Sequence, residues 1–418
     1  MHIHLPHSWQ AEVTEYYVFV TMWMMGNYGS NILLPLYLLD NGYSLAHIII
    51  LCLINEAALV FFLFLSSMVM KRWGFRIILG LGIMLFTAFL MLLVFLETTA
   101  GMIDMFWFLG LIFVVRGLGK AFLNFGHEVF MIKVATRKKG GSVISWFRIC
   151  MIVASVMTPA VMGLAAYVFG YDIAFLALAT LSAASMIPLL MIPNHQFQIN
   201  YRPKGLVPLM RTRIKKRYLL AEVGRSFADG VLFIMWPVFV FLAVGNVKDV
   251  GLITSASAFL SIIVAYLIGR MLNDRRRKKS DTVFRIGVRM SAFMYVLRSA
   301  FPTPLLLTIV DACNRICESV VQVNFETRCY RYLKSMSDQD KIETANVRCL
   351  MIEGVYILAL FYMLSIVMMF QQPSTLMFAV TFSFSALTIL LMTQIIAVRC
   401  PVPSVQKPRW WQWWKQEC

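Results

Sequence analysis

Long apolar segments follow one another along almost the whole chain, separated by short polar connections. We predict twelve such segments, each long enough for a helix that rises 1.5 Å per residue to cross a hydrocarbon core about 30 Å thick. Their ranges are 14–39, 45–69, 77–96, 104–131, 143–168, 173–193, 218–243, 249–270, 281–300, 302–331, 343–370 and 374–397. The pattern predicts an all-α integral membrane protein with twelve transmembrane helices.

The connections between these segments alternate in charge. One set is short and nearly free of Lys and Arg, with Lys248 as the main exception. The other set is basic and comprises Lys71 to Arg76, Lys133 to Lys139, Arg202 to Arg217, Arg275 to Lys279 and Arg328 to Lys341. Because basic connections remain on the cytoplasmic side, we expect cytoplasmic N- and C-termini and a location in the cytoplasmic membrane.

The composition agrees with a membrane protein. The 418 residues include 38 Lys and Arg against 21 Asp and Glu, a net charge of +17, yet only 14% of residues are charged and 60% are hydrophobic. Soluble domains contain about 25% charged residues. The basic residues lie in connections, so we expect no nucleic-acid partner. The sequence shows no phosphate-binding loop and no helical histidine pair, and we expect no enzyme activity, no cofactor and no metal site.

Short sequence similarities about 200 residues apart suggest two halves. Arg148 to Ile152 resembles Arg348 to Ile352, Asn124-Phe125 recurs as Asn324-Phe325, and Pro35 and Gly42 correspond to Pro237 and Gly245. Six segments are an even number, so both halves have the same orientation. Two parallel repeats of six helices, with a site between them, are a known plan of secondary transporters.

The expected boundaries follow from this division. We predict an N-terminal six-helix half over 1–193, a basic cytoplasmic linker over 194–217 and a C-terminal six-helix half over 218–397. The remaining residues, 398–418, form a Trp-rich tail that we expect to lie on the cytoplasmic face as an interfacial anchor.

Several short motifs resemble those of the major facilitator superfamily over essentially the whole chain. Arg72, Gly74 and Arg76 match the family motif G-x-x-x-D-R-x-G-R-[RK] between the second and third segments, with Lys71 at the position of the acid. The second half carries Asp274 and Arg275 at the corresponding place. Further similar stretches are Arg116 to Lys120 in the fourth segment and Pro159 with Gly163 in the fifth. The resemblance implies that Arg72, Gly74, Arg76, Asp274 and Arg275 form gating loops.

Polar residues inside the apolar segments are candidate site residues, because an ionisable group in the membrane is expensive unless it faces a partner or a cavity. The fourth segment carries Arg116, Lys120, Asn124 and Glu128 at intervals of four, which is one helix face. The resemblance implies that segments 1, 4, 7 and 10 line a central cavity. We therefore expect the substrate to contact Asn27, Asn31, Arg116, Lys120, Asn124, Asp229, Arg315 and Glu318.

Four carboxyl groups are candidates for proton coupling: Glu56, Asp229, Asp311 and Glu318. Glu56 lies near the middle of the second segment, where its neutral form is inexpensive. The competing interpretation is that these charges are ion pairs that fix helix packing, and we favour it for Glu222 and Arg225. For Arg348, near a cytoplasmic end, we expect snorkelling or a pair with a loop acid.

The expected function is secondary active transport of a small solute by alternating access, coupled to protons. Arg116 and Lys120 lie one helical turn apart and repel each other, so an acid or an anionic ligand should accompany them. With Arg315 they favour an organic anion or a zwitterion as substrate. The alternatives are a polyspecific drug/proton antiporter, a transporter-like membrane sensor and, least favoured, a lipid-modifying enzyme. We expect a monomer whose partners are the substrate, H+ and the lipid bilayer.

Overall fold

The computed structural model describes residues 9–96, 105–135, 140–194, 216–272, 277–300, 303–334 and 338–397. This part of the chain is helical and has no strand. The first half contains α1 (Trp9–Asp40), α2 (Leu45–Trp73), α3 (Phe75–Val94), α5 (Met105–Ala135), α6 (Gly140–Phe169), α7 (Tyr171–Ala184) and α8 (Met186–Met191). The second half contains α10 (Lys216–Val244), α11 (Val247–Leu272), α12 (Arg277–Leu297), α13 (Pro304–Lys334), α14 (Asp338–Phe370), α15 (Thr375–Ile389) and the 3₁₀ helix η2 (Leu390–Ala397).

Each predicted apolar segment overlaps one helix or two consecutive helices. The sixth segment corresponds to α7 and α8, and the twelfth to α15 and η2. Within the described residues, eight helical stretches are long and apolar enough to cross a membrane: those in α2, α3, α5, α6, α7 with α8, α10, α14, and α15 with the start of η2. The chain is thus a multi-pass membrane protein. Membrane crossing by α1, α11, α12 and α13 stays a prediction; in α13 the charged residues Asp311, Arg315 and Glu318 interrupt the apolar sequence.

Large apolar side chains on the outside of the bundle agree with a lipid environment. Phe61, Trp107 and Met369 are exposed over 75%, 70% and 76% of their surface. In water such side chains would form an aggregation-prone surface, whereas lipid tails solvate them. The buried interior contains aromatic residues such as Tyr16, Phe75 and Phe130, which contact one another.

The two halves use the same helix pairings. In the first half α2 packs on α5, α3 on α5 and α7, and α1 on α6. In the second half α11 packs on α13, α12 on α13 and α15, and α10 on α14. Both first helices end before a glycine with positive φ, Gly42 at 82° and Gly245 at 76°, a conformation that other residues rarely adopt. These matching features are of the kind that an internal repeat would produce, and the repeat itself stays a prediction.

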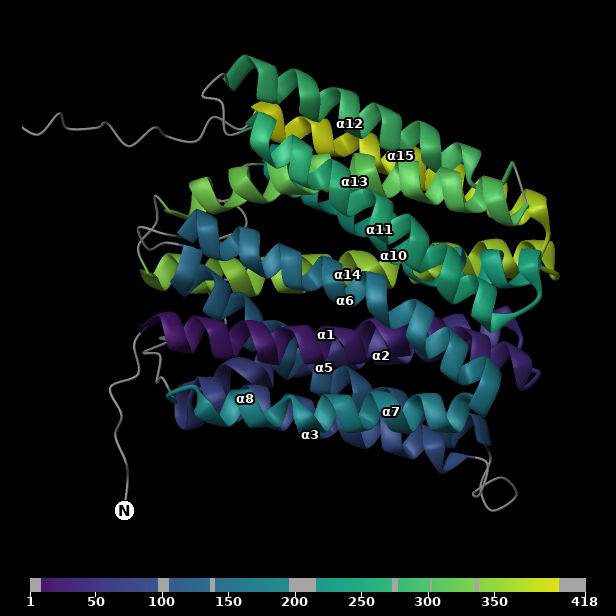
Figure 1. Ribbon diagram of the computed structural model, residues 1–418, viewed down its shortest axis with the longest axis horizontal. Coiled ribbons are helices and arrows are strands. Elements are labelled where there is room, and N and C mark those ends of the chain that lie inside the picture. The colour runs from purple at the N-terminus through teal and green to yellow at the C-terminus, as the bar shows by residue number, and fades with distance from the viewer. Residues whose placement is uncertain are drawn as a thin grey trace, which may run out of the picture.

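The halves meet along two helix pairs, α2 with α14 and α6 with α11. In Figure 1 the helices of residues 9–194 occupy the lower part of the bundle and those of 216–397 the upper part, with α6 and α14 in the middle. The α6–α11 crossing is close. A Cβ added to Gly251 would lie 2.2 Å from the carbonyl oxygen of Pro159, and one added to Gly163 would lie 2.9 Å from that of Val247.

Candidate functional site

Arg116 is a buried guanidinium in the middle of the first half, 2% exposed. Its Nη2 donates a hydrogen bond of 2.5 Å to Oδ1 of Asn31 on α1, and its guanidinium lies 5.0 Å from the ring centre of Phe89. Its Nε has no hydrogen-bond partner, and among the described residues no carboxylate forms an ion pair with it. A buried charge without a counter-charge is expensive, which makes Arg116 the leading candidate for binding an anion.

Lys120, one helical turn further along α5, differs from Arg116 because it has a carboxylate partner. Its Nζ lies 2.9 Å from Oε1 of Glu56 on α2, and both side chains are largely buried. The same Glu56 oxygen accepts a hydrogen bond of 2.7 Å from Asn55. Thus the acid expected beside the two cations is present, but it neutralises Lys120 rather than Arg116.

Asn124 continues the polar face of α5 and reaches the other half. Its Nδ2 donates a hydrogen bond of 3.1 Å to Oε1 of Glu353 on α14. The sequence analysis did not select Glu353. The corresponding residue of the first half is Val153, so the internal repeat does not single out Glu353.

The second half contains its own buried charge cluster. The Asp311 carboxylate is fully buried and accepts hydrogen bonds from Arg298 at 2.5 Å and from Arg315 at 2.7 Å. Glu318, expected at the substrate, accepts hydrogen bonds from Tyr295 and Asn314. Arg298 was missed because it lies near the end of the predicted segment 281–300, where an arginine resembles an interfacial residue. Its guanidinium instead points inward, 4.4 Å from the ring centre of Trp236.

A third cluster joins the halves near the predicted cytoplasmic end, where α1, α10 and α14 begin. Arg348 on α14 contacts Glu128 on α5 at 2.6 Å and Glu222 on α10 at 3.4 Å. The expectation of snorkelling or of a loop acid is wrong for Arg348, because the helix packing brings two helix acids to it. Arg225 pairs with Glu222 at 2.8 Å and with Asp229 at 3.4 Å, as an ion-pair role requires.

Several other predicted site residues are not bonded to Arg116 in the part of the chain that the structure describes. Asn27 lies one turn from Asn31, and no hydrogen bond joins it to Arg116 in the described part of the chain. Arg72 is exposed, while Arg76 donates hydrogen bonds to the carbonyl groups of Leu190 and Ile192 and so attaches the α2–α3 turn to the end of α8. Asp274 and Arg275, most of the predicted linker and the Trp-rich tail lie outside the described residues.

The space beside Arg116 is small. A cavity of about 10 Å³ is lined by residues of both halves, including Asn31, Cys52, Arg116 and Phe233. That volume holds about one water molecule. The halves are therefore closed around Arg116, and a larger ligand reaches it only if they separate.

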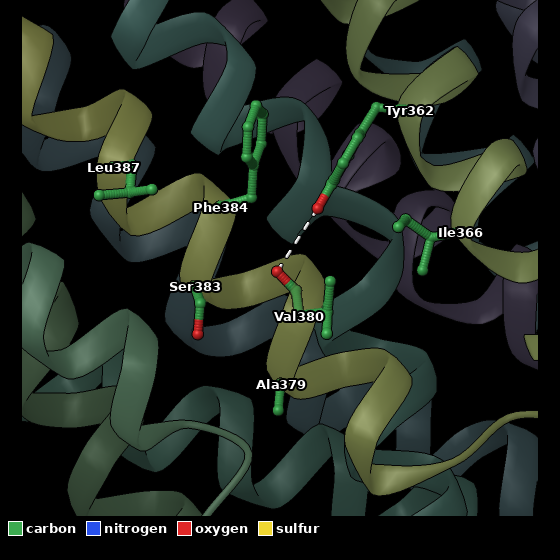
Figure 2. Close-up of a pocket in the computed structure, with 7 residues that line it drawn as sticks. All are labelled: Tyr362, Ile366, Ala379, Val380, Ser383, Phe384 and Leu387. Atoms are coloured by element: carbon green, nitrogen blue, oxygen red, sulfur yellow. Dashed lines mark hydrogen bonds between the residues drawn. The ribbon is translucent and has the colours of Figure 1, made fainter.

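A larger groove lies elsewhere, between α14 and α15, and it does not resemble a polar substrate site. Figure 2 shows its lining, which includes Tyr362, Val380, Phe384 and Leu387. Its volume is about 530 Å³, and its walls are almost entirely apolar. The Tyr362 hydroxyl is engaged with the carbonyl oxygen of Val380 at 3.4 Å, and Leu387 is 65% exposed. Lipid tails suit this surface better than a polar solute.

Comparison with known proteins gives one family. The sequence pattern of the Major Facilitator Superfamily matches residues 17–334, which include α1 from its third turn and continue to the end of α13. No curated protein matches the chain. Because the match covers well over half of the 418 residues and the helices form a multi-pass bundle, the chain belongs to the Major Facilitator Superfamily.

Proposed function

We propose that this protein is a proton-coupled secondary transporter of an organic anion or zwitterion, with Arg116 as the residue that binds the anionic group. The superfamily comprises membrane proteins that bind small-molecule substrates and in general act as secondary transporters. The observation that carries the proposal is the buried Arg116 guanidinium, which faces a cavity between the halves without an acidic partner among the described residues.

The proposed mechanism is alternating access. Two parallel halves of six membrane-crossing helices rock about the site, so that Arg116 faces one side of the membrane at a time. Contacts between the halves support this: Arg348 with Glu128 near one end, and Ser255 of α11 with the backbone N–H of Ala160 of α6 at 2.8 Å. We place the termini in the cytoplasm, the protein in the cytoplasmic membrane, and the functional unit in a monomer.

The remaining predicted site residues have different roles in this proposal. Asn31 bonds to Arg116, Lys120 and Asn124 lie one and two turns further along α5, and Arg315 and Glu318 would contribute from the second half. Asp311 is the least suited of the four candidate acids to take up a proton, because two guanidinium groups hold its carboxylate in the ionised form. A drug/proton antiporter remains the second candidate, supported by Pro159 and Gly163, although both residues serve the close α6–α11 crossing.

Ligand-dependent thermal stability of the purified protein tests the proposal. The panel contains anions (pyruvate, lactate, gluconate, succinate), zwitterions (glutamate, glycine betaine) and lipophilic cations (tetraphenylphosphonium, ethidium). A ligand at 100 times its Kd stabilises the folded state by about 2.7 kcal/mol. We expect an anion or zwitterion to raise the Tm of the wild type, and R116Q to abolish that rise.

The matched control is Lys248→Gln, which removes a cation at the start of α11, in the other half of the chain from Arg116. The Lys248 ammonium lies 5.6 Å from the ring centre of Tyr167. This variant should retain the full ligand-induced rise. Stabilisation by lipophilic cations alone, unchanged in R116Q, would establish the antiporter alternative and make Arg116 a packing residue.

A further inference from the structure

Two carboxyl groups face each other across the boundary between the halves. Glu56 of α2 and Glu353 of α14 are 6% and 7% exposed, and they bond to Lys120 and Asn124, which lie one helical turn apart on α5. One oxygen of each group is already engaged: Oε1 of Glu56 with Lys120 and Asn55, and Oε1 of Glu353 with Asn124. The helices α2 and α14 that carry them pack along each other.

The second oxygens of the two groups have no donor. Oε2 of Glu56 and Oε2 of Glu353 are both buried and unpartnered. Two ionised carboxylates buried side by side repel each other strongly in a medium of low polarity. One bound proton removes the repulsion and supplies the donor that both oxygens lack.

We propose that Glu56 and Glu353 form a shared proton site, and that its proton is carried together with the anion bound at Arg116. This inference rests on the proposed function and names its coupling site. Glu353, which belongs to the opposite half from Glu56, makes the site complete only while the α2–α14 contact is closed. Separation of the halves then releases the proton to water.

The charge balance explains why proton and anion move together. Arg116 and Lys120 carry two positive charges, and ionised Glu56 and Glu353 carry two negative ones. A proton alone leaves this buried group at +1, and a monoanion alone leaves it at −1, whereas both together leave it neutral. Because a net charge is unfavourable in the membrane interior, each ligand strengthens the binding of the other. The result is electroneutral symport of one proton with one monoanion.

The surrounding charges do not replace the proton. The other titratable and charged groups near the pair are Arg116 and Lys120 on α5, Cys52 on α2, Cys349 and Tyr356 on α14, and more distantly Asp229, Glu222 and Arg225 on α10. Arg225 and Arg348 already have acidic partners of their own. Among the described residues, Lys120 forms its ion pair with Glu56, and no cation forms an ion pair with Glu353.

The test measures the affinity of the most stabilising monoanion of the panel between pH 5 and 8. One-proton linkage limits the change to about tenfold in Kd per pH unit. We expect the wild type to approach this slope, with tighter binding at lower pH, and E353Q and E56Q to change less than twofold per unit. Glu128→Gln, which removes another acid between the halves, is the control and should retain the wild-type slope.

Proton uptake can also be measured directly. In weakly buffered detergent solution with a pH indicator, addition of the monoanion should cause uptake of up to one proton per anion bound by the wild type, and no uptake by E353Q. If E56Q does not fold, E56Q/K120M removes the ion pair as a unit and replaces it.

The outcomes separate the two proposals. Anion binding that depends on Arg116 but shows an unchanged pH slope in both E353Q and E56Q, or no proton uptake in the wild type, overturns the carboxyl pair alone. Failure of every anion and zwitterion to bind the wild type at any pH overturns the proposed function and the symport with it.

Discussion

At the residue scale, two cations one helical turn apart on α5 have different environments. Lys120 has an acidic partner at 2.9 Å, whereas Arg116 has an amide partner, an aromatic ring and an unsatisfied Nε. Both residues lie on the same face of one apolar helix. The difference arises because α2 presents Glu56 to Lys120, while α1 presents Asn31 to Arg116. Lys120 is therefore neutralised within the protein, and Arg116 is the cation that we propose to be available for a ligand.

This assignment makes a prediction for Lys120. K120M leaves Glu56 buried without its cation, and breaking a buried pair costs about 3–5 kcal/mol. We expect a clear loss in Tm during thermal denaturation in detergent, and recovery of more than half of that loss in E56Q/K120M, where both charges are absent. Losses that simply add in the double variant would show that the pair does not stabilise the fold.

At the scale of the helices, the sequence alone predicts where they begin and end to within a few residues, because a helix that crosses a bilayer needs a long apolar segment. It also predicts which residues share a helix face, which is why Arg116, Lys120 and Asn124 emerge together. Partners across helices depend on how each helix is rotated and tilted, and one sequence does not fix these. Glu353 and Arg298 were missed for this reason, and Arg348 received the wrong partner.

The α6–α11 crossing gives a prediction at this scale. G251A places a methyl group 2.2 Å from the Pro159 carbonyl oxygen, and because backbone cannot yield as a side chain does, we expect about 1–3 kcal/mol of destabilisation. G354A is the matched control, since a Cβ at this helical glycine meets nothing within 4 Å. Alanine there should stabilise by up to about 1 kcal/mol. Equal Tm changes in both variants would contradict the close crossing.

At the scale of the whole molecule, the structure shows the halves closed around the site. Arg348 and Glu128 connect them near the predicted cytoplasmic end, Asn124 and Glu353 near the middle, and Ala160 and Ser255 along α6 and α11. The cavity of about 10 Å³ beside Arg116 is too small for an organic anion. Under the proposed alternating-access mechanism, at least one set of these contacts must break in each cycle.

Counterflow in proteoliposomes tests the central claim most directly, because it requires both binding at Arg116 and reorientation of the halves. Vesicles containing the protein are loaded with the stabilising anion and diluted into a trace of the same anion in radiolabelled form. We predict transient accumulation of label by the wild type, at least tenfold less by R116Q, and wild-type accumulation by K248Q. Equal accumulation by R116Q and wild type, or none with any anion or zwitterion of the panel, would contradict the account.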